Sequence, residues 1–337
     1  MAQEDRRRVL GLLAEGKISA DEAERLLEVL DSRESHSVSS EETIDDKIEQ
    51  AVTTTVRSAV ATARSVVAAA ASAEDVADSS ISERRADSFR VEGVPTLVVD
   101  NFNGMVEIVG DSADGSVEVS AEIRHPELVD YLAMQEGDTI LVRTKPSGRR
   151  SFLGWRFLNR GAYIRVSLPR NANLDVQTTN GRVVLRRIEG VGTARTSNGR
   201  IEAEEVSGNF EMRTSNSRIN GRRLEGDFRL ETSNGRIEAL DGRGTFDAET
   251  SNGRIRFRGE ILPRKESRLV TSNGSIDATL GGEASLRVSA RTSNGSIVCD
   301  REVEIRGERK KRHLEGVIGD GEGALTLRTS NGSITIE

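Results

Sequence analysis

An internal repeat constrains this chain more than any other feature of its sequence. The motif Thr-Ser-Asn-Gly-Arg/Ser-Ile recurs eight times, with small variations, between residues 178 and 334. Successive motif asparagines lie 18, 18, 18, 18, 21, 21 and 37 residues apart. Such a period is typical of architectures in which each unit packs on its neighbours. A diverged copy, NFNGMV, contains Asn103, and the eight motif asparagines are Asn180, Asn198, Asn216, Asn234, Asn252, Asn273, Asn294 and Asn331.

Apolar residues alternate with polar ones inside each unit, which predicts short β-strands. Asn-Gly marks one bend of the unit and a second glycine, such as Gly208, marks the other. Antiparallel hairpins and a β-solenoid both fit this pattern. The recurrence of Ile201, Ile219 and Ile237 at one position, and of phenylalanine at another, favours the solenoid, because its coils place equivalent residues in direct contact.

We therefore expect a mainly β fold, a β-solenoid (β-helix) of 18-residue coils over residues 90–337. The corner asparagines should hydrogen-bond to their neighbours in the coils above and below. Residues 91–177 contain less regular strands and should form the first coils, with a short helical excursion at 125–134. The chain stops directly after its last motif, so we expect either self-association of an exposed final coil or masking by the 37-residue insertion.

The N-terminal part has a helical pattern. Residues 1–31 predict a helical hairpin, whose second helix starts at a capping box from Ser19 to Glu22. Residues 32–42 and 79–89 are polar and predict linkers. Between them, residues 43–78 predict a long Ala-rich amphipathic helix. Three roles for this helix stay open: a cap on the solenoid, a self-association helix, or a helix on a membrane surface.

The composition offers little for catalysis or metal binding. There is one cysteine and there are three histidines, and the outward acidic residues are scattered. We expect no catalytic, cofactor or metal site, and therefore a protein that is not an enzyme. No apolar run is long enough to span a bilayer and no signal peptide is evident, so we expect a cytoplasmic protein, with membrane association left open.

Charge is distributed unevenly along the chain. The net charge of −7 arises in residues 1–90, which hold 12 basic and 19 acidic residues, while residues 91–337 hold 36 of each. Bulk charge therefore does not predict a polyanion binder, and no specific nucleic acid is expected as a partner. Any anion site must come from a local patch.

Two local patches could bind anions. One arginine per coil follows the Asn-Gly corner, and this row would suit a linear polyanion such as a teichoic acid, anionic lipid headgroups or nucleic acid. Neutralisation by Glu202 and Glu238 is the competing interpretation. The second patch is a basic run in the longest insertion, which could equally be only solvated. The row comprises Arg182, Arg200, Arg218, Arg236 and Arg254, and the run comprises Arg309, Lys310, Lys311 and Arg312.

Together these segments resemble the YvlB/LiaX-like bacterial proteins. The segment EDRRRVLGLLAEGKISADEAERLLEVLD is similar to their SHOCT-like helical module, and the TSNGRI units are similar to their "putative adhesin" β-strand repeat domain of unknown function. The resemblance implies binding rather than catalysis, in bacterial cell-envelope stress responses. It carries over no catalytic residue.

Three functions follow as expectations. The first is a non-enzymatic binding or scaffold protein of the envelope stress response, whose partner is another copy, an envelope-stress protein, an anionic membrane surface or a polyanion. The second is a structural solenoid that polymerises through its ends. The third is a surface adhesin, which would require export.

Overall fold

The computed structural model describes residues 82–113, 115–147, 160–282, 284–300 and 310–337. Contacts divide the chain into two units, Met1–Asp78 and Ser79–Glu337, and the described residues all belong to the second. The helical hairpin expected at 1–31, the linker 32–42 and the Ala-rich helix expected at 43–78 lie outside the described residues. In the described part, no helix is long and apolar enough to cross a membrane.

Four successive repeats form the regular middle of this unit. Each is a bent 14-residue strand: β9 (Val183–Thr196), β10 (Ile201–Thr214), β11 (Ile219–Thr232) and β12 (Ile237–Thr250). Neighbouring strands pair in parallel with a register of one repeat, so that Ile201 lies between Val183 and Ile219. The expected parallel solenoid is therefore confirmed, because a chain of hairpins would pair its neighbouring strands antiparallel.

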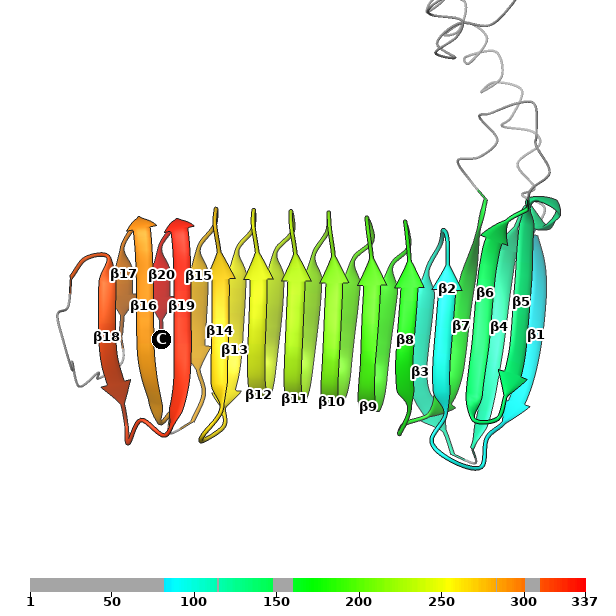
Figure 1. Ribbon diagram of the computed structural model, residues 1–337, viewed down its shortest axis with the longest axis horizontal. Coiled ribbons are helices and arrows are strands. Elements are labelled where there is room, and N and C mark those ends of the chain that lie inside the picture. Colours follow the sequence, from blue (N-terminus) through cyan, green and yellow to red (C-terminus); the bar gives the residue numbers. More distant parts are fainter. Residues whose placement is uncertain (1–81, 114, 148–159, 283, 301–309) are drawn as a thin grey trace, which may run out of the picture. The chain divides into compact units, whose positions relative to one another are not determined.

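The bend halfway along each strand divides the tube into two walls (Figure 1). We call wall 1 the sheet that contains the first halves of β9–β12, and wall 2 the sheet that contains their second halves. Gly244 shows why the bend needs glycine: its φ is 139°, and an added Cβ would lie 2.0 Å from the carbonyl oxygen of Gly226. After β12 the repeat continues as separate strands, β13 (Ile255–Ile261) on wall 1 and β14 (Glu266–Thr271) on wall 2.

The core fills the narrow space between the walls with complementary side-chain sizes. Phe210, Phe228 and Phe246 stack from coil to coil, with ring centroids 6.1 and 5.6 Å apart. The wall 1 column Ala203, Gly221 and Ala239 is small in the same three coils. The next coil reverses the order and places Phe257 on wall 1 and Ser267 on wall 2. Because one bulky residue per coil is sufficient, the low aromatic content is compatible with a closely packed interior.

In the part of the chain that the structure describes, strands with antiparallel pairing lie at the N-terminal end of the stack. The coil β2–β3 lies between the coil β6–β7 and the repeat coil β8–β9. Beyond the coil β6–β7, β5 pairs antiparallel with β6 on wall 2. On wall 1, β4 pairs antiparallel with β7, and β1 pairs antiparallel with β4. These strands are β1 (Ser82–Arg90), β2 (Thr96–Asn101), β3 (Val106–Ser112), β4 (Ser116–Arg124), β5 (Val129–Glu136), β6 (Thr139–Pro146), β7 (Gly161–Pro169) and β8 (Asn173–Thr178).

Two expectations are wrong at this end. Part of the segment expected as the linker 79–89 is β1, which pairs along its whole length with β4. The helical excursion expected at 125–134 is a single 3₁₀ turn, Pro126–Leu128, followed by β5. Both strands lie at the end of the stack and are largely exposed, so few of their side chains are buried.

At the C-terminal end, the order of the strands in space differs from their order in the sequence. Strand β19 lies between β14 and β16 on wall 2, and β20 lies between β15 and β17 on wall 1. Strand β18 pairs antiparallel with β16 and forms the edge of wall 2. The strands are β15 (Ile276–Leu280), β16 (Leu286–Asn294), β17 (Ile297–Cys299), β18 (His313–Ile318), β19 (Gly323–Asn331) and β20 (Ile334–Ile336).

The last repeat therefore does not form the exposed final coil. It inserts between the two preceding repeats, and the C-terminus lies within the stack (Figure 1). Strand β18 belongs to the 37-residue insertion and covers the edge of β16 on wall 2, which agrees with the masking alternative, while self-association stays a prediction.

Candidate binding surface

The motif asparagines form one continuous ladder at the corner between wall 2 and wall 1, as expected. Each Nδ2 donates to the Oδ1 of the preceding member at 2.7–3.0 Å. The order in space is Asn180, Asn198, Asn216, Asn234, Asn252, Asn273, Asn331 and Asn294, which follows the inserted last repeat. The ladder is structural, because both polar ends of most of its amides are occupied by the neighbouring amides.

A second ladder at the same corner was missed by the sequence reasoning. The buried motif threonine donates its hydroxyl to a corner carbonyl of the neighbouring coil, for example Thr214 to Gly199 at 2.8 Å and Thr250 to Gly235 at 2.8 Å. The invariance of threonine among the motifs was the available signal. The glycine is needed because a Cβ at Gly199 would lie 1.6 Å from the carbonyl oxygen of Gly181.

The outer face of wall 1 is rich in arginine. From the coil of β9 to that of β15 it presents nine arginines and four carboxylates. The corner arginines expected as a row are its first column, and β9, β11 and β13 add further arginines on the same face. The nine are Arg182, Arg186, Arg200, Arg218, Arg222, Arg236, Arg254, Arg256 and Arg258, and the four are Glu202, Glu204, Glu238 and Asp277.

Most of the expected corner row is neutralised. Glu202 lies 2.8 Å from Arg200 and 3.9 Å from Arg182. Glu238 lies 3.7 Å from Arg236, on the same strand, and Asp277 lies 3.5 Å from Arg254. The charge pairing expected for Glu202 and Glu238 is thus present. These pairs are at least partly exposed, and each contributes only about 0–1 kcal/mol.

Three wall 1 arginines have no carboxylate within 4.0 Å among the described residues: Arg218, Arg222 and Arg256. Arg218 differs from its corner neighbours because Asn220 stands two residues later, where the adjoining coils have Glu202 and Glu238. The Nε of Arg218 is shielded from solvent and has no hydrogen-bond partner in the described part of the chain. Like-charged corner residues flank it on both sides.

Arg222 and Arg256 lie beside carboxylates that other arginines occupy. Glu204, next to Arg222, accepts from Arg223 at 2.7 Å and lies 3.9 Å from Arg186. The neighbours of Arg256 in its column are Glu238 and Asp277, which pair with corner arginines. Competition for a few carboxylates therefore leaves positive charge on β11 and β13.

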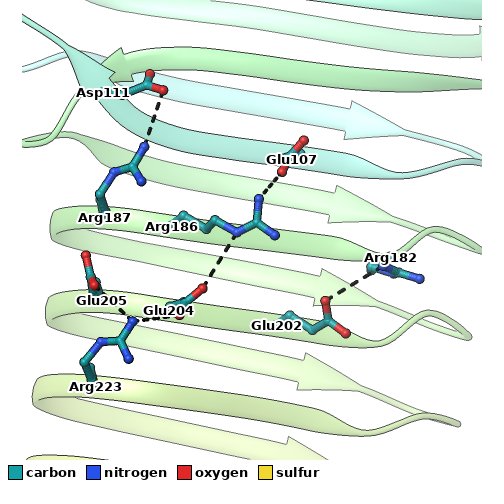
Figure 2. A network of polar contacts seen from close by, with 9 residues as sticks. All are labelled: Glu107, Asp111, Arg182, Arg186, Arg187, Glu202, Glu204, Glu205 and Arg223. Atoms are coloured by element: carbon teal, nitrogen blue, oxygen red, sulfur yellow. Dashed lines mark hydrogen bonds and ion pairs between the residues drawn. The ribbon is translucent and has the colours of Figure 1, made fainter.

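Figure 2 shows the end of the same face where β3 pairs with β9 and where the charged side chains form ion pairs with one another. Arg186 contacts Glu107 on one side and Glu204 on the other. Glu107 is only 7% exposed, and it also accepts a hydrogen bond from the Tyr163 hydroxyl at 2.6 Å. Burial and this bond raise the pKa of Tyr163. The charges at this end are mutually engaged, which leaves β11–β13 as the region available to a ligand.

The outer face of wall 2 has the opposite balance. Over the coils of β8 to β14 it presents seven carboxylates and four arginines. The zero net charge of residues 91–337 therefore conceals a basic and an acidic face. The seven are Asp175, Glu211, Asp227, Glu231, Asp247, Glu249 and Glu266, and the four are Arg195, Arg213, Arg229 and Arg268.

The basic run of the long insertion is divided by the boundary of the described residues. Arg309 lies outside them. Lys310, Lys311 and Arg312 are exposed and form the tight turn that leads into β18. Their backbone is structural, since the carbonyls of Lys311 and Arg312 accept hydrogen bonds from Ile297 and Thr292.

Other chemistry is sparse in the part of the chain that the structure describes. It contains no group of three or more His, Cys, Asp or Glu residues that could hold a metal ion. A shallow depression on wall 1 is lined by charged and polar side chains, including Arg186, Glu202, Asn220 and Arg222.

The fold and this surface define a class: a parallel β-solenoid with antiparallel strands at both ends and two oppositely charged walls. Residues 96–337 match the family model described as "Toastrack DUF4097", and residues 4–35 match that of a "SHOCT-like domain". The first match covers more than half of the chain, which therefore belongs to the Toastrack DUF4097 family. The pairing of the two modules confirms the resemblance drawn from the sequence. A search of curated proteins found no match.

A comparison with solved structures matches proteins from several bacteria. One is titled a "putative lipid binding protein" from Parabacteroides distasonis (15% identity, 76% of this chain and 97% of that chain covered, TM-score 0.37). Another is a "putative adhesin" from the same species (12% identity, 77% and 98% covered, TM-score 0.35). A third is a "putative cell adhesion protein" from Clostridium sporogenes (10% identity, 76% and 98% covered, TM-score 0.24).

Proposed function

We propose that this protein is a non-enzymatic binding protein of the bacterial cell-envelope stress response, and that the outer face of wall 1 is its ligand-binding surface. The observation that carries the proposal is the excess of arginine on this face, nine against four carboxylates over six adjoining coils. A solenoid holds these side chains in fixed rows about 4.8 Å apart. Such a surface can engage an extended ligand at many points without rearrangement.

The structure gives less support to polymerisation through the solenoid ends. Wall 2 ends on both sides in a strand that runs antiparallel to the repeat strands, β5 at one end and β18 at the other. A further copy stacked in the parallel register of the repeat would not match these strands. Adhesion to a cell surface is one form of the binding proposed here, and the following experiment includes it.

Binding of the full-length protein to isolated bacterial cell envelopes tests the proposal. The test variant reverses three wall 1 charges, Arg236→Glu, Arg254→Glu and Arg258→Glu. The matched control reverses three wall 2 charges, Arg195→Glu, Arg213→Glu and Arg268→Glu. We expect only the wall 1 variant to lose co-sedimentation with the envelopes. Equal binding by both variants and the parent would refute wall 1 as the binding surface.

The stress role is tested in cells. A strain that lacks the protein is exposed to agents that damage the envelope, and its survival is compared with that of strains complemented by the parent and by the wall 1 variant. We expect the parent alone to restore survival. Full survival of the strain lacking the protein under every agent would contradict the proposed role.

A further inference from the structure

We propose that strands β11 to β13 of wall 1 bind a linear phosphodiester polymer that carries no bases, held by Arg218, Arg222 and Arg256. This inference rests on the proposed function, and it names the ligand class and the residues. It replaces the regular corner row, most of which is neutralised, with three arginines selected by their lack of carboxylate partners in the described part of the chain.

No carboxylate of the described residues forms an ion pair with these three arginines. Their nearest carboxylates are engaged by other arginines, as shown above for Glu204, Glu238 and Asp277. Guanidinium groups bind phosphate oxygens through two parallel hydrogen bonds.

The spacing favours an extended ligand. Arg218 and Arg256 lie two coils apart, about 10 Å along the solenoid. Arg218 directly precedes β11, and Arg222 lies four residues later within it, about 13 Å away. A single phosphate engages one or two guanidinium groups at a time. A chain with phosphates along its length engages all three, and the second and third contacts then form at high effective concentration.

The surroundings distinguish between polyanions. Single-stranded nucleic acids are held partly by stacking on aromatic side chains, and the outward positions of wall 1 from β9 to β15 contain none. A membrane surface is favoured by exposed apolar side chains that enter it. The exposed large apolar residues of the described part lie away from β11–β13; those nearest on wall 1 are Tyr163 and Val298, on β7 and β17. A water-soluble polymer of alternating phosphate and polyol fits these features best.

Fluorescence anisotropy with labelled poly(glycerol phosphate) tests the inference on the full-length protein. We expect saturable binding of the polymer, with an affinity at least about 100-fold higher than the affinity for inorganic phosphate measured by competition. Binding should weaken steeply as the salt concentration rises. The triple variant Arg218→Gln, Arg222→Gln, Arg256→Gln should bind at least about 10-fold more weakly, with a shallower salt dependence. The control Arg195→Gln, Arg213→Gln, Arg229→Gln removes the same charge from wall 2 and should bind like the parent.

The remaining arms identify the outcomes that overturn the inference. Equal or tighter binding to polydeoxythymidylate, or binding only to phosphatidylglycerol vesicles, would reject the base-free polymer as the ligand. An equal loss in both triple variants would reject the assignment to β11–β13. If the polymer does not bind but envelope binding still depends on wall 1, the inference fails and the proposed function stands. Loss of wall 1 dependence in the envelope assay would remove both.

Discussion

The phenylalanine stack provides the sharpest test of the solenoid core. Phe228 is 2% exposed and lies between Phe210 and Phe246, with Gly221 on the opposite wall of its coil. Replacing Phe228 with alanine removes at least ~150 Å² of buried apolar surface. At ~25 cal/mol per Å², the loss of stabilising free energy is roughly 4 kcal/mol. This agrees with the ~3–5 kcal/mol typical of buried Phe→Ala changes. The small residue opposite cannot fill the space, so we expect the upper part of that range.

Denaturant titration of the full-length protein, followed by far-UV circular dichroism, measures this loss. Phe228→Leu keeps most of the volume and should cost less than about 2 kcal/mol. Val191→Ala lies on the outer face of wall 2, where Val191 is 52% exposed, and should change stability by at most about 0.5 kcal/mol. A Phe228→Ala loss below about 1.5 kcal/mol, or one equal to that of Val191→Ala, would refute the packing described here.

Three further predictions concern the corner, the bend and the tyrosines. Asn216→Ala removes two ladder hydrogen bonds, of 2.8 and 3.0 Å, and should lower the free energy of unfolding by about 1–2 kcal/mol; an unchanged denaturation midpoint would contradict the ladder. Gly244→Ala forces a Cβ against backbone and should cost more than Gly137→Ala, where φ is 59° and nothing lies within 4 Å; equal losses would contradict the close approach of the coils. Tyr131 and Tyr163 are the only tyrosines, and burial followed by hydrogen bonds to Asp and Glu carboxylates raises the pKa of both. Their stabilising contribution is therefore complete below the unfolded pKa of about 10 and is lost as the pH rises through the folded values. Near-UV absorbance should show both phenols ionising above pH 10 in the folded protein, and ionisation of either at or below that pH would show that the carboxylate contacts are absent.

The repeat by itself was sufficient for the coil. Spacing and alternation identified the inward columns of Ile201 and Phe210, the parallel stacking and the asparagine ladder, because each depends on residues one repeat apart. These interactions are the same in every copy, so the pattern needs no knowledge of distant contacts. The motif threonines followed the same rule, but the sequence analysis did not predict their hydrogen bonds to corner carbonyls.

The order of the end strands and the charge of the two faces depend on contacts between segments distant in the sequence. Nothing local in β19 specifies that it enters between β14 and β16, because the repeats share a motif and pair equally well in several orders. The antiparallel pairing of β18 with β16, and that of β1 with β4, likewise join segments distant in sequence. Which arginines remain without a carboxylate depends on competition between neighbouring coils for each acid: Arg200 lies 2.8 Å from Glu202, whereas Arg218 has no carboxylate within 4.0 Å among the described residues. Periodic contacts repeat along the chain and can be predicted from it, whereas strand order and charge pairing emerge only when the coils are assembled.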